Sequence, residues 1–405
     1  MVSVPQMNRT PWPAVVAVGV LLAVSFGTVL YGFSIYVTDS AAGAEFSSSM
    51  LSLAYAGSVV ASGLLATPLG KWMDRHGARS VAAFGGVITC AGLFAFSLSS
   101  GPLTLLASWW LIIGPGTAMT YYEPAFVVIN QNVSPARRPH ALGIVTLIGG
   151  LAGAIFIPVI EFMNSSLGWR PTVRLLGAAI ALIGVGGALL IPRRTSEQAQ
   201  ESVAQHVPLG EILRDRRFTY LTTGLVLAFM SFNGIVAHRV DRFVEAGFAV
   251  GLVALLAAVA SLVSMPGRFL GPFLGGRRRG IEVLQGFLVV VAISIALAIP
   301  DGAAWLMYGH FVLFGLAFGA VLPLRALAMD QWYGRNHYGR RMGIQQSVTL
   351  VVGGLGPLAV GVARDLTGGF TIPMVGVFLA AVAGLFFVAL AQRAPAPSEP
   401  VAAEG

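Results

Sequence analysis

A short charged segment, residues 70–79, reads GKWMDRHGAR and separates two long apolar runs. The preceding run covers 48–69 and the following run covers 80–98. Each contains roughly the 20 residues that an α-helix needs to cross the hydrocarbon core of a bilayer. Charged side chains are costly inside that core, so they mark the place where the chain leaves it. The segment therefore predicts a charged turn that connects two membrane-spanning helices.

The composition of the whole chain points to the same class of protein. Hydrophobic residues make up 56% of the 405 residues and charged residues only 10%, whereas soluble globular domains carry about 25% charged residues. A membrane β-barrel would show strands of about 10 residues with alternating polarity, and the sequence lacks that alternation. We therefore expect an all-α integral membrane protein.

Twelve apolar segments are long enough to span a membrane. We expect the first six at 13–37, 48–70, 80–99, 103–131, 140–163 and 169–191, and the second six at 218–238, 247–271, 281–299, 303–329, 342–363 and 370–390. This spacing predicts an N-terminal six-helix half over 1–191, a cytoplasmic linker over 192–217, and a C-terminal six-helix half over 218–391. The Pro-, Ala- and Glu-containing tail, 392–405, has the composition of a disordered segment.

The positions of the charges predict the orientation of the spans. Most of the basic residues fall in alternate connections, including Arg137, Arg138 and the run Arg277–Arg279, while the other connections carry acids such as Asp301. Cytoplasmic loops carry the excess of arginine and lysine. The net charge of +8 is thus a topology signal and does not indicate a nucleic-acid partner. We expect both termini in the cytoplasm, in the inner or plasma membrane of the cell.

The charged segment also carries a recognisable pattern. Gly70, Asp74, Arg75, Gly77 and Arg79 fit the G-x-x-x-D-R-x-G-x-R/K signature, and the chain resembles the major facilitator superfamily in this signature, in its twelve spans and in its central linker. The resemblance implies two six-helix halves that rock around a central site and give alternating access. It also implies that these five residues form a conformational latch, with Asp74 near the positive N-terminal end of span 11.

The corresponding segment of the second half, 271–279, reads GPFLGGRRR and has Gly275 where the pattern has its acid. The latch is therefore expected to depend mainly on the acid of the first half.

Three stretches resemble the monocarboxylate and oxalate/formate porters within that superfamily: Tyr31–Phe33, Gly267–Arg268, and Gly353–Pro357 with 365–369. The resemblance implies that Arg268 in span 8 binds a substrate carboxylate, which suits the forked geometry of a guanidinium group. Alternatively, Arg268 reaches the membrane surface or joins the arginine cluster at 277–279. Span 11 contains no lysine, which argues against a dicarboxylate held by two cations.

Other polar groups inside the spans are candidates for solute binding and for proton coupling. Tyr31, Tyr121 and Asn233 lie in spans that line the central cavity in the superfamily, although tyrosines also form interfacial belts. Glu123 is the carboxylate deepest in the first-half spans, and burial favours the protonated form of a carboxylic acid. The alternative for Glu123 is an ion pair near Arg137 and Arg138.

His238 and His310 are further proton-coupling candidates, because histidine titrates near neutral pH; an interfacial polar role is the alternative. Arg325 and Asp330 bracket the inner end of span 10 and are expected to form a gate or an interhelical ion pair.

The sequence argues against ATP hydrolysis and against an enzyme. The only lysine is Lys71, followed by Trp72, so no P-loop is present, and no nucleophile–base pair, metal cluster or cofactor motif converges. We expect a monomeric secondary transporter for a small organic anion, foremost a monocarboxylate, coupled to protons or to a counter-solute. The alternative is a proton-coupled exporter of drugs or of neutral or cationic metabolites, with Glu123 as its proton site.

Overall fold

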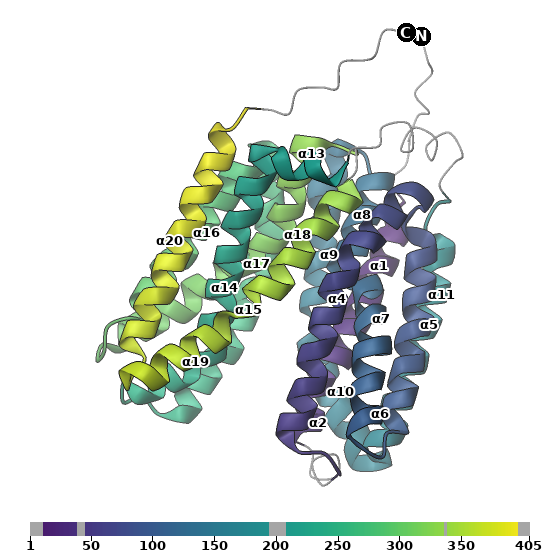
Figure 1. The fold of residues 1–405 in the computed structure, drawn as a ribbon, viewed down its shortest axis with the longest axis horizontal. Coiled ribbons are helices and arrows are strands. Elements are labelled where there is room, and N and C mark those ends of the chain that lie inside the picture. The colour runs from purple at the N-terminus through teal and green to yellow at the C-terminus, as the bar shows by residue number, and fades with distance from the viewer. Residues whose placement is uncertain (1–10, 39–44, 194–207, 336–337, 396–405) are drawn as a thin grey trace. The chain divides into compact units, whose positions relative to one another are not determined.

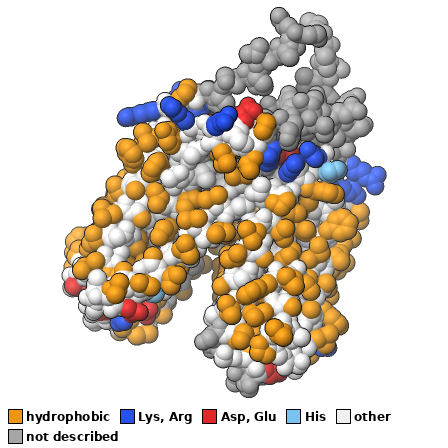
Figure 2. All heavy atoms as spheres, in the orientation of Figure 1, with side chains coloured by type: hydrophobic (Ala, Val, Ile, Leu, Met, Phe, Trp, Pro, Cys, Tyr) orange, Lys and Arg blue, Asp and Glu red, His pale blue; other side chains and the backbone are white. Residues whose placement is uncertain are grey.

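The computed structural model describes residues 11–38, 45–193, 208–335 and 338–395. These residues are helical, with no strand among them. Twelve of their helical segments are long and apolar enough to cross a membrane, which confirms the expected all-α, twelve-span class. Figure 2 shows hydrophobic side chains along the sides of the helices and basic side chains gathered at one end of each group of helices.

The chain forms two compact units, one of residues 1–205 with 333–351 and the other of 206–332 with 352–405. The sequence places all of span 11 in the C-terminal half, whereas the N-terminal part of this span packs with the first unit. Both termini and most of the expected linker, 192–217, lie outside the described residues. Of the expected disordered tail, 392–405, the first two residues continue the last helix, and 396–405 lie outside the described residues.

The first unit is built from the helices of spans 1–6 and the first part of span 11. Figure 1 labels most of them, and α5 and α11 pack side by side there. Their bounds are α1 Trp12–Ser25, η1 Phe26–Tyr31, α2 Gly32–Thr38, α4 Ser48–His76, α5 Ala78–Ser97, α6 Pro102–Ala107, η2 Ser108–Ile113, α7 Gly114–Thr120, α8 Tyr122–Asn132, η3 Pro135–Arg137, α9 Arg138–Gly150, α10 Ala152–Leu167, α11 Trp169–Leu190 and α18 Tyr338–Gly353.

The second unit contains a short helix that precedes span 7 and the helices of spans 7–10, the end of span 11 and span 12. Within it, α14 packs against both α19 and α20. The bounds are α13 Leu209–Arg214, α14 Arg216–Glu245, α15 Val250–Arg277, α16 Gly280–Leu297, α17 Ala304–Tyr333, α19 Gly356–Thr367 and α20 Thr371–Arg393.

The charged segment 70–79 is largely helical, so the prediction of a turn over its whole length was wrong. Helix α4 continues to His76, and α5 begins at Ala78. Only Gly77 leaves the helical conformation, with φ of +81°, a value that favours glycine because it lacks a Cβ atom. The charged residues before Gly77 occupy the last turns of α4, where long side chains can reach water while the backbone keeps its helical hydrogen bonds.

Several spans are interrupted where proline or glycine removes helical contacts. Span 4 breaks at Tyr121, which has an extended ψ of −155°, three residues before Pro124. Proline is tolerated in a first helical turn because its missing N–H would have no intrahelical partner there. Span 11 is also interrupted, between α18 and α19, where Leu355 keeps αR backbone angles and Pro357 occupies the first turn of α19. Span 1 instead contains the π-helical segment η1, an irregularity common at functional sites.

Candidate functional site

Three tyrosines converge inside the first unit. Tyr31 ends η1, Tyr55 lies in α4, and Tyr121 lies at the break between α7 and α8. Their hydroxyl groups are close enough for Tyr55 to interact electrostatically with both of the others. A Cβ atom on Gly153 would come within 2.9 Å of Tyr31 Cζ, so the Tyr31 ring rests against bare backbone of α10. The arrangement presents several phenol groups, each able to donate a hydrogen bond.

Glu123 lies directly beyond this tyrosine cluster, in the first turn of α8, and is 8% exposed. The two residues before it, Tyr121 and Tyr122, both pack against Phe26, with ring centroids 4.1 Å and 5.2 Å away. The Glu123 carboxyl group therefore lies at a helix N-terminus and is buried among the packed helices. The structure thus brings a buried carboxyl group and the tyrosines into one region of the first unit.

Arg268 lies at the edge of a close helix crossing in the second unit. A Cβ atom on Gly267 would lie 2.0 Å from Leu316 O, and one on Gly319 would lie 2.1 Å from Ser264 O. The backbones of α15 and α17 therefore touch at small residues, a packing mode common in membranes. Arg268 directly follows Gly267 at this crossing and is partly buried.

Arg325 and Asp330 both lie on α17 and are buried, with 0% and 8% of their surface exposed. The side chain of the next residue, Gln331, holds the arginine-rich connection between α15 and α16. It donates to Gly275 O at 3.0 Å and accepts from Gly280 N at 2.6 Å. A Cβ atom on Gly275 would lie 2.8 Å from Leu324 Cδ2 and 2.9 Å from Leu327 Cδ2, so a larger residue here would have to displace these two side chains of α17. In the segment 271–279, which has no acid at Gly275, the neutral amide of Gln331 therefore forms the hydrogen bonds to the backbone.

Asn233 and His238 face the interrupted span 11 from α14. Asn233 Nδ2 donates to Gly353 O at 3.0 Å, and His238 Nε2 lies 3.0 Å from Pro357 O. Gly353 ends α18, and its carbonyl group has no intrahelical donor, because the residue four positions on is a proline without an N–H. His238 contacts a carbonyl group in the first turn of α19. Both side chains therefore stabilise the break, and any contact with solute or proton would exchange these hydrogen bonds.

Arg239 is a residue that the sequence analysis did not select. Its guanidinium carbon lies 5.3 Å and 5.7 Å from the ring centroids of Phe311 and Phe314. His310 lies between the same rings, fully buried, with Nδ1 2.8 Å from Ser294 O. His310 Nε2 has no hydrogen-bond partner among the described residues. The expected span 7 ended at 238 and so left Arg239 outside, but α14 continues to Glu245.

The carboxylate of Asp74 caps the N-terminus of α18 inside the first unit. Oδ1 accepts the N–H of Gly339 at 2.8 Å, and Oδ2 accepts the N–H of Arg340 at 2.7 Å. The two backbones are close, because a Cβ atom on Gly70 would lie 2.1 Å from Gly339 O. One turn further along α4, Thr67 Oγ1 and Ser347 Oγ are 2.8 Å apart. Of the five signature residues, Gly70 and Asp74 form this contact, and Gly77 separates α4 from α5. Arg75 is partly exposed, and Arg79 faces α11.

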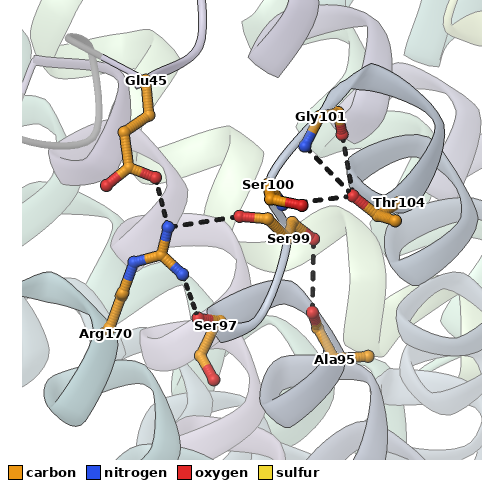
Figure 3. Close-up of polar contacts among 8 residues, drawn as sticks. All are labelled: Glu45, Ala95, Ser97, Ser99, Ser100, Gly101, Thr104 and Arg170. Carbon is orange, nitrogen blue, oxygen red and sulfur yellow. Dashed lines mark hydrogen bonds and ion pairs between the residues drawn. The ribbon is translucent and has the colours of Figure 1, made fainter.

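Arginine side chains hold the connections at the opposite ends of the spans. In Figure 3, Arg170 donates to the carbonyl groups of Ser97 and Ser99 and pairs with Glu45. In the second unit, the buried Arg242 donates to Ala298 O and Ile299 O at 2.9 Å and 2.7 Å. Arg242 also pairs with Asp301 at 2.8 Å. Each arginine satisfies carbonyl groups at the end of a spanning helix, which is a structural role.

Among the described residues, no group of histidine, cysteine and acidic side chains is placed to hold a metal ion. Charged and phenolic groups lie inside the spanning helices, as in proteins that move solutes through membranes.

Comparisons with known proteins agree with that arrangement. Monocarboxylate transporter 13 of Rattus norvegicus is 25% identical over 368 residues, 90% of this chain and 85% of its own length. Monocarboxylate transporter 11 of Mus musculus is 27% identical over 330 residues, 76% of this chain and 71% of its own.

Two solved structures share the fold. The fucose:proton symporter FucP of E. coli superposes with a TM-score of 0.73 at 15% identity, covering 94% of this chain and 98% of that one. The human organic anion transporter TETRAN gives 0.72 at 15% identity and covers 95% and 100%. The model of the Major Facilitator Superfamily matches residues 15–330. These similarities, together with twelve spans and the Asp74 cap, show that the chain is a membrane transporter and belongs to the Major Facilitator Superfamily.

Proposed function

We propose that this transporter carries a small organic anion, foremost a monocarboxylate, by secondary active transport with alternating access. The observation that carries the proposal is Arg268, a guanidinium group inside a spanning helix of a chain similar over most of its length to monocarboxylate transporters. A guanidinium group binds a carboxylate through two parallel hydrogen bonds. Arg268 is thus the proposed anchor, and Tyr31, Tyr121 and Asn233 are proposed to contact the rest of the solute.

We further propose that Glu123 couples the solute to protons. A carboxyl group that is buried in one conformation and hydrated in another binds and releases a proton as its surroundings alternate. Its place beside the Tyr31–Tyr55–Tyr121 group supports this role, since a change in solute contacts there also changes its hydration. Exchange against a counter-solute without proton movement is the other form of the proposal. His238 and His310 are secondary proton candidates, and Arg325 with Asp330 a candidate gate.

The cap on α18 supports a latch role for residues 70–79. The Asp74 hydrogen bonds stabilise one conformation of the carrier and must break as it converts to the other. We propose that the arginine-rich ends of the spans face the cytoplasm, in the cell's inner or plasma membrane, with the protein working as a monomer.

The test is uptake of labelled lactate, pyruvate and formate into proteoliposomes that contain the purified protein, with and without a pH gradient. Arg268→Ala is expected to reduce uptake at least about tenfold, because a charge-assisted pair contributes about 1.5–3 kcal/mol, and Arg268→Lys to restore part of it. The matched control is Arg364→Ala, since Arg364 is an exposed arginine on α19. Full uptake by Arg268→Ala, or no uptake of any monocarboxylate by the unaltered protein, would contradict the proposal.

A second candidate function is the export of cationic or neutral compounds. Specific support comes from the aromatic rings around the tyrosine cluster, because aromatic faces attract cations. Phe33 and Tyr55 are stacked 4.6 Å apart, and Phe26 packs against Tyr121, two residues before Glu123. Protection of cells against a toxic panel, lost in Glu123→Gln and kept in Arg268→Ala, would favour export over anion uptake.

A further inference from the structure

A basic pocket lies between α5 and α11 in the first unit, beside the last turn of α4. Its volume is about 390 Å³, and it is lined by His76, Arg79, Ser80, Ala83, Val185, Ala188, Leu189 and Arg193. Figure 1 shows α5 and α11 side by side along one edge of the unit. The pocket lies where α5 begins and α11 ends.

The helix crossing explains why a pocket forms there. A Cβ atom on Gly86 would lie 3.0 Å from the Cα atom of Gly184, so the two backbones touch at this point. Ala83, about one turn before Gly86, and Val185, the residue after Gly184, already line the pocket. Helices that touch at one point diverge on either side of it, and the small residues here leave the diverging ends unfilled.

The polar end of the pocket carries positive charge and no acid. Arg79 and Arg193 are the permanent cations, and His76 adds an imidazole ring. Neither arginine forms an ion pair with a carboxylate among the described residues. The first-turn N–H groups of α5 add partial positive charge, since Gly77 offers them no side-chain cap. The charge of this end is complementary to a phosphate group.

The other end of the pocket is apolar and continues onto the outer surface of the helices. Val185 and Leu189 are 43% and 67% exposed, and Phe84 and Leu182 beyond them are 62% and 76% exposed. Trp72 lies at the polar end, half exposed, with its ring 4.3 Å from that of His76 and Nε1 3.4 Å from Ser80 Oγ. A tryptophan between polar and apolar surfaces is typical of the depth of lipid headgroups.

We propose that this pocket binds the headgroup phosphate of an anionic phospholipid, with the acyl chains along the apolar faces of α5 and α11. Arg79 and Arg193 contact the phosphate, and Trp72 with His76 closes the headgroup side. A free phosphate ion would use the cations but not the apolar wall, so the surface favours a lipid. Basic pockets between spanning helices are known to suit anionic headgroups. The inference is independent of the solute that the protein carries.

The test measures lipid retention by the purified full-length protein in detergent, using native mass spectrometry. Phosphatidylglycerol and phosphatidylcholine of identical chain length are compared, and inorganic phosphate is added as a competitor. The double variant Arg79→Gln/Arg193→Gln is expected to bind phosphatidylglycerol about 30-fold more weakly, since each basic group near an anionic lipid surface strengthens binding about fivefold. The matched control is Arg214→Gln/Arg216→Gln, which removes two exposed arginines outside the pocket and is expected to retain the lipid.

A second readout follows the lipid at the pocket itself. Phosphatidylglycerol with brominated chains should quench the part of the fluorescence that is lost in Trp72→Phe, and this quenching should disappear in the Arg79/Arg193 double variant. Equal thermal unfolding of both double variants shows that each is folded. The proposal is overturned by equal retention of the two lipids, by unchanged binding in the pocket variant, or by displacement of the lipid at millimolar phosphate.

Discussion

Asp74 and Arg340 are joined side chain to backbone: Oδ2 of Asp74 accepts the N–H of Arg340 at 2.7 Å. With the matching bond from Gly339 N to Oδ1, one carboxylate satisfies two of the N–H groups that begin α18. Hydrogen bonds to a charged acceptor contribute about 1.5–3 kcal/mol each, and the helix dipole favours the same charge. The contact is therefore strong enough to bias a conformational equilibrium.

Asp74→Asn should slow transport without weakening solute binding. The amide keeps one acceptor oxygen but loses the charge and one acceptor, so the conformation with capped α18 becomes less populated. We expect the maximal uptake rate to fall about tenfold, which corresponds to about 1.4 kcal/mol, with the half-saturating concentration unchanged. Uptake kinetics in proteoliposomes measure both. Asp74→Glu is the control that keeps the charge, and a large change in half-saturation at an unchanged maximal rate would contradict the latch.

Gly70→Ala should disturb the same contact through size. Its Cβ atom would lie 2.1 Å from Gly339 O, a backbone atom that cannot swing aside. Overpacking of this kind costs about 1–3 kcal/mol, so α4 and α18 should separate and uptake should fall. Gly186→Ala is the matched control, because that helical glycine has no atom within 4 Å of the added Cβ. Equal uptake and equal thermal stability of the two variants would show that the close approach is unimportant.

Arg242 and Asp301 should contribute very unequally to stability, although they form one ion pair. Arg242→Ala removes the donor to two carbonyl groups and should lower the free energy of unfolding by about 3 kcal/mol. Asp301→Asn should change it by less than about 1 kcal/mol, since the Asp301 side chain is 68% exposed. Thermal unfolding of the purified variants in detergent provides the comparison. Similar losses in both variants would mean that the ion pair, and not the carbonyl contacts, stabilises the loop.

Glu123→Gln should remove the pH dependence of transport. If the carrier binds its solute with Glu123 protonated, uptake by the unaltered protein rises as the pH on the donor side falls. The glutamine side chain is neutral at every pH, so uptake by the variant should not change with pH. His310→Asn is the comparison, because its amide can still donate to Ser294 O and it leaves Glu123 intact; its uptake should keep the pH dependence. Initial rates across a pH series distinguish the two. Loss of pH dependence in His310→Asn alone would move the proton site to the second unit.

The tertiary structure extends the sequence-based expectations most clearly at helix ends. Hydropathy located the membrane core of span 7 but ended it at 238, whereas α14 continues to Glu245. The charged residues of this extension are placed by partners far away in sequence, Arg239 by Phe311 and Phe314 and Arg242 by Ala298 and Ile299. The sequence around Arg239 and Arg242 does not indicate these distant partners.

For the candidate site, too, the sequence indicates individual residues, and the tertiary structure shows which of them lie together. Arg268, Tyr31, Tyr121 and Glu123 were selected because polar groups inside apolar spans are costly and therefore informative. That Tyr55 joins Tyr31 and Tyr121, and that Asn233 and His238 serve the break in span 11, depends on how separate helices turn toward one another. The helical periodicity of the sequence does not determine which face of each span points toward its neighbours, because the spans are apolar on nearly every face.

The sequence by itself determined the twelve spans, the charged ends and the signature at 70–79, because each depends on the cost of placing a charge or a free backbone group in hydrocarbon, which acts residue by residue. Only the tertiary structure decided that the signature is mostly helix, that Asp74 caps α18 within the first unit, and that Arg79 faces a pocket with Arg193. These relationships arise where glycines let particular backbones touch. Close packing depends on the fit of two surfaces, which neither segment specifies alone.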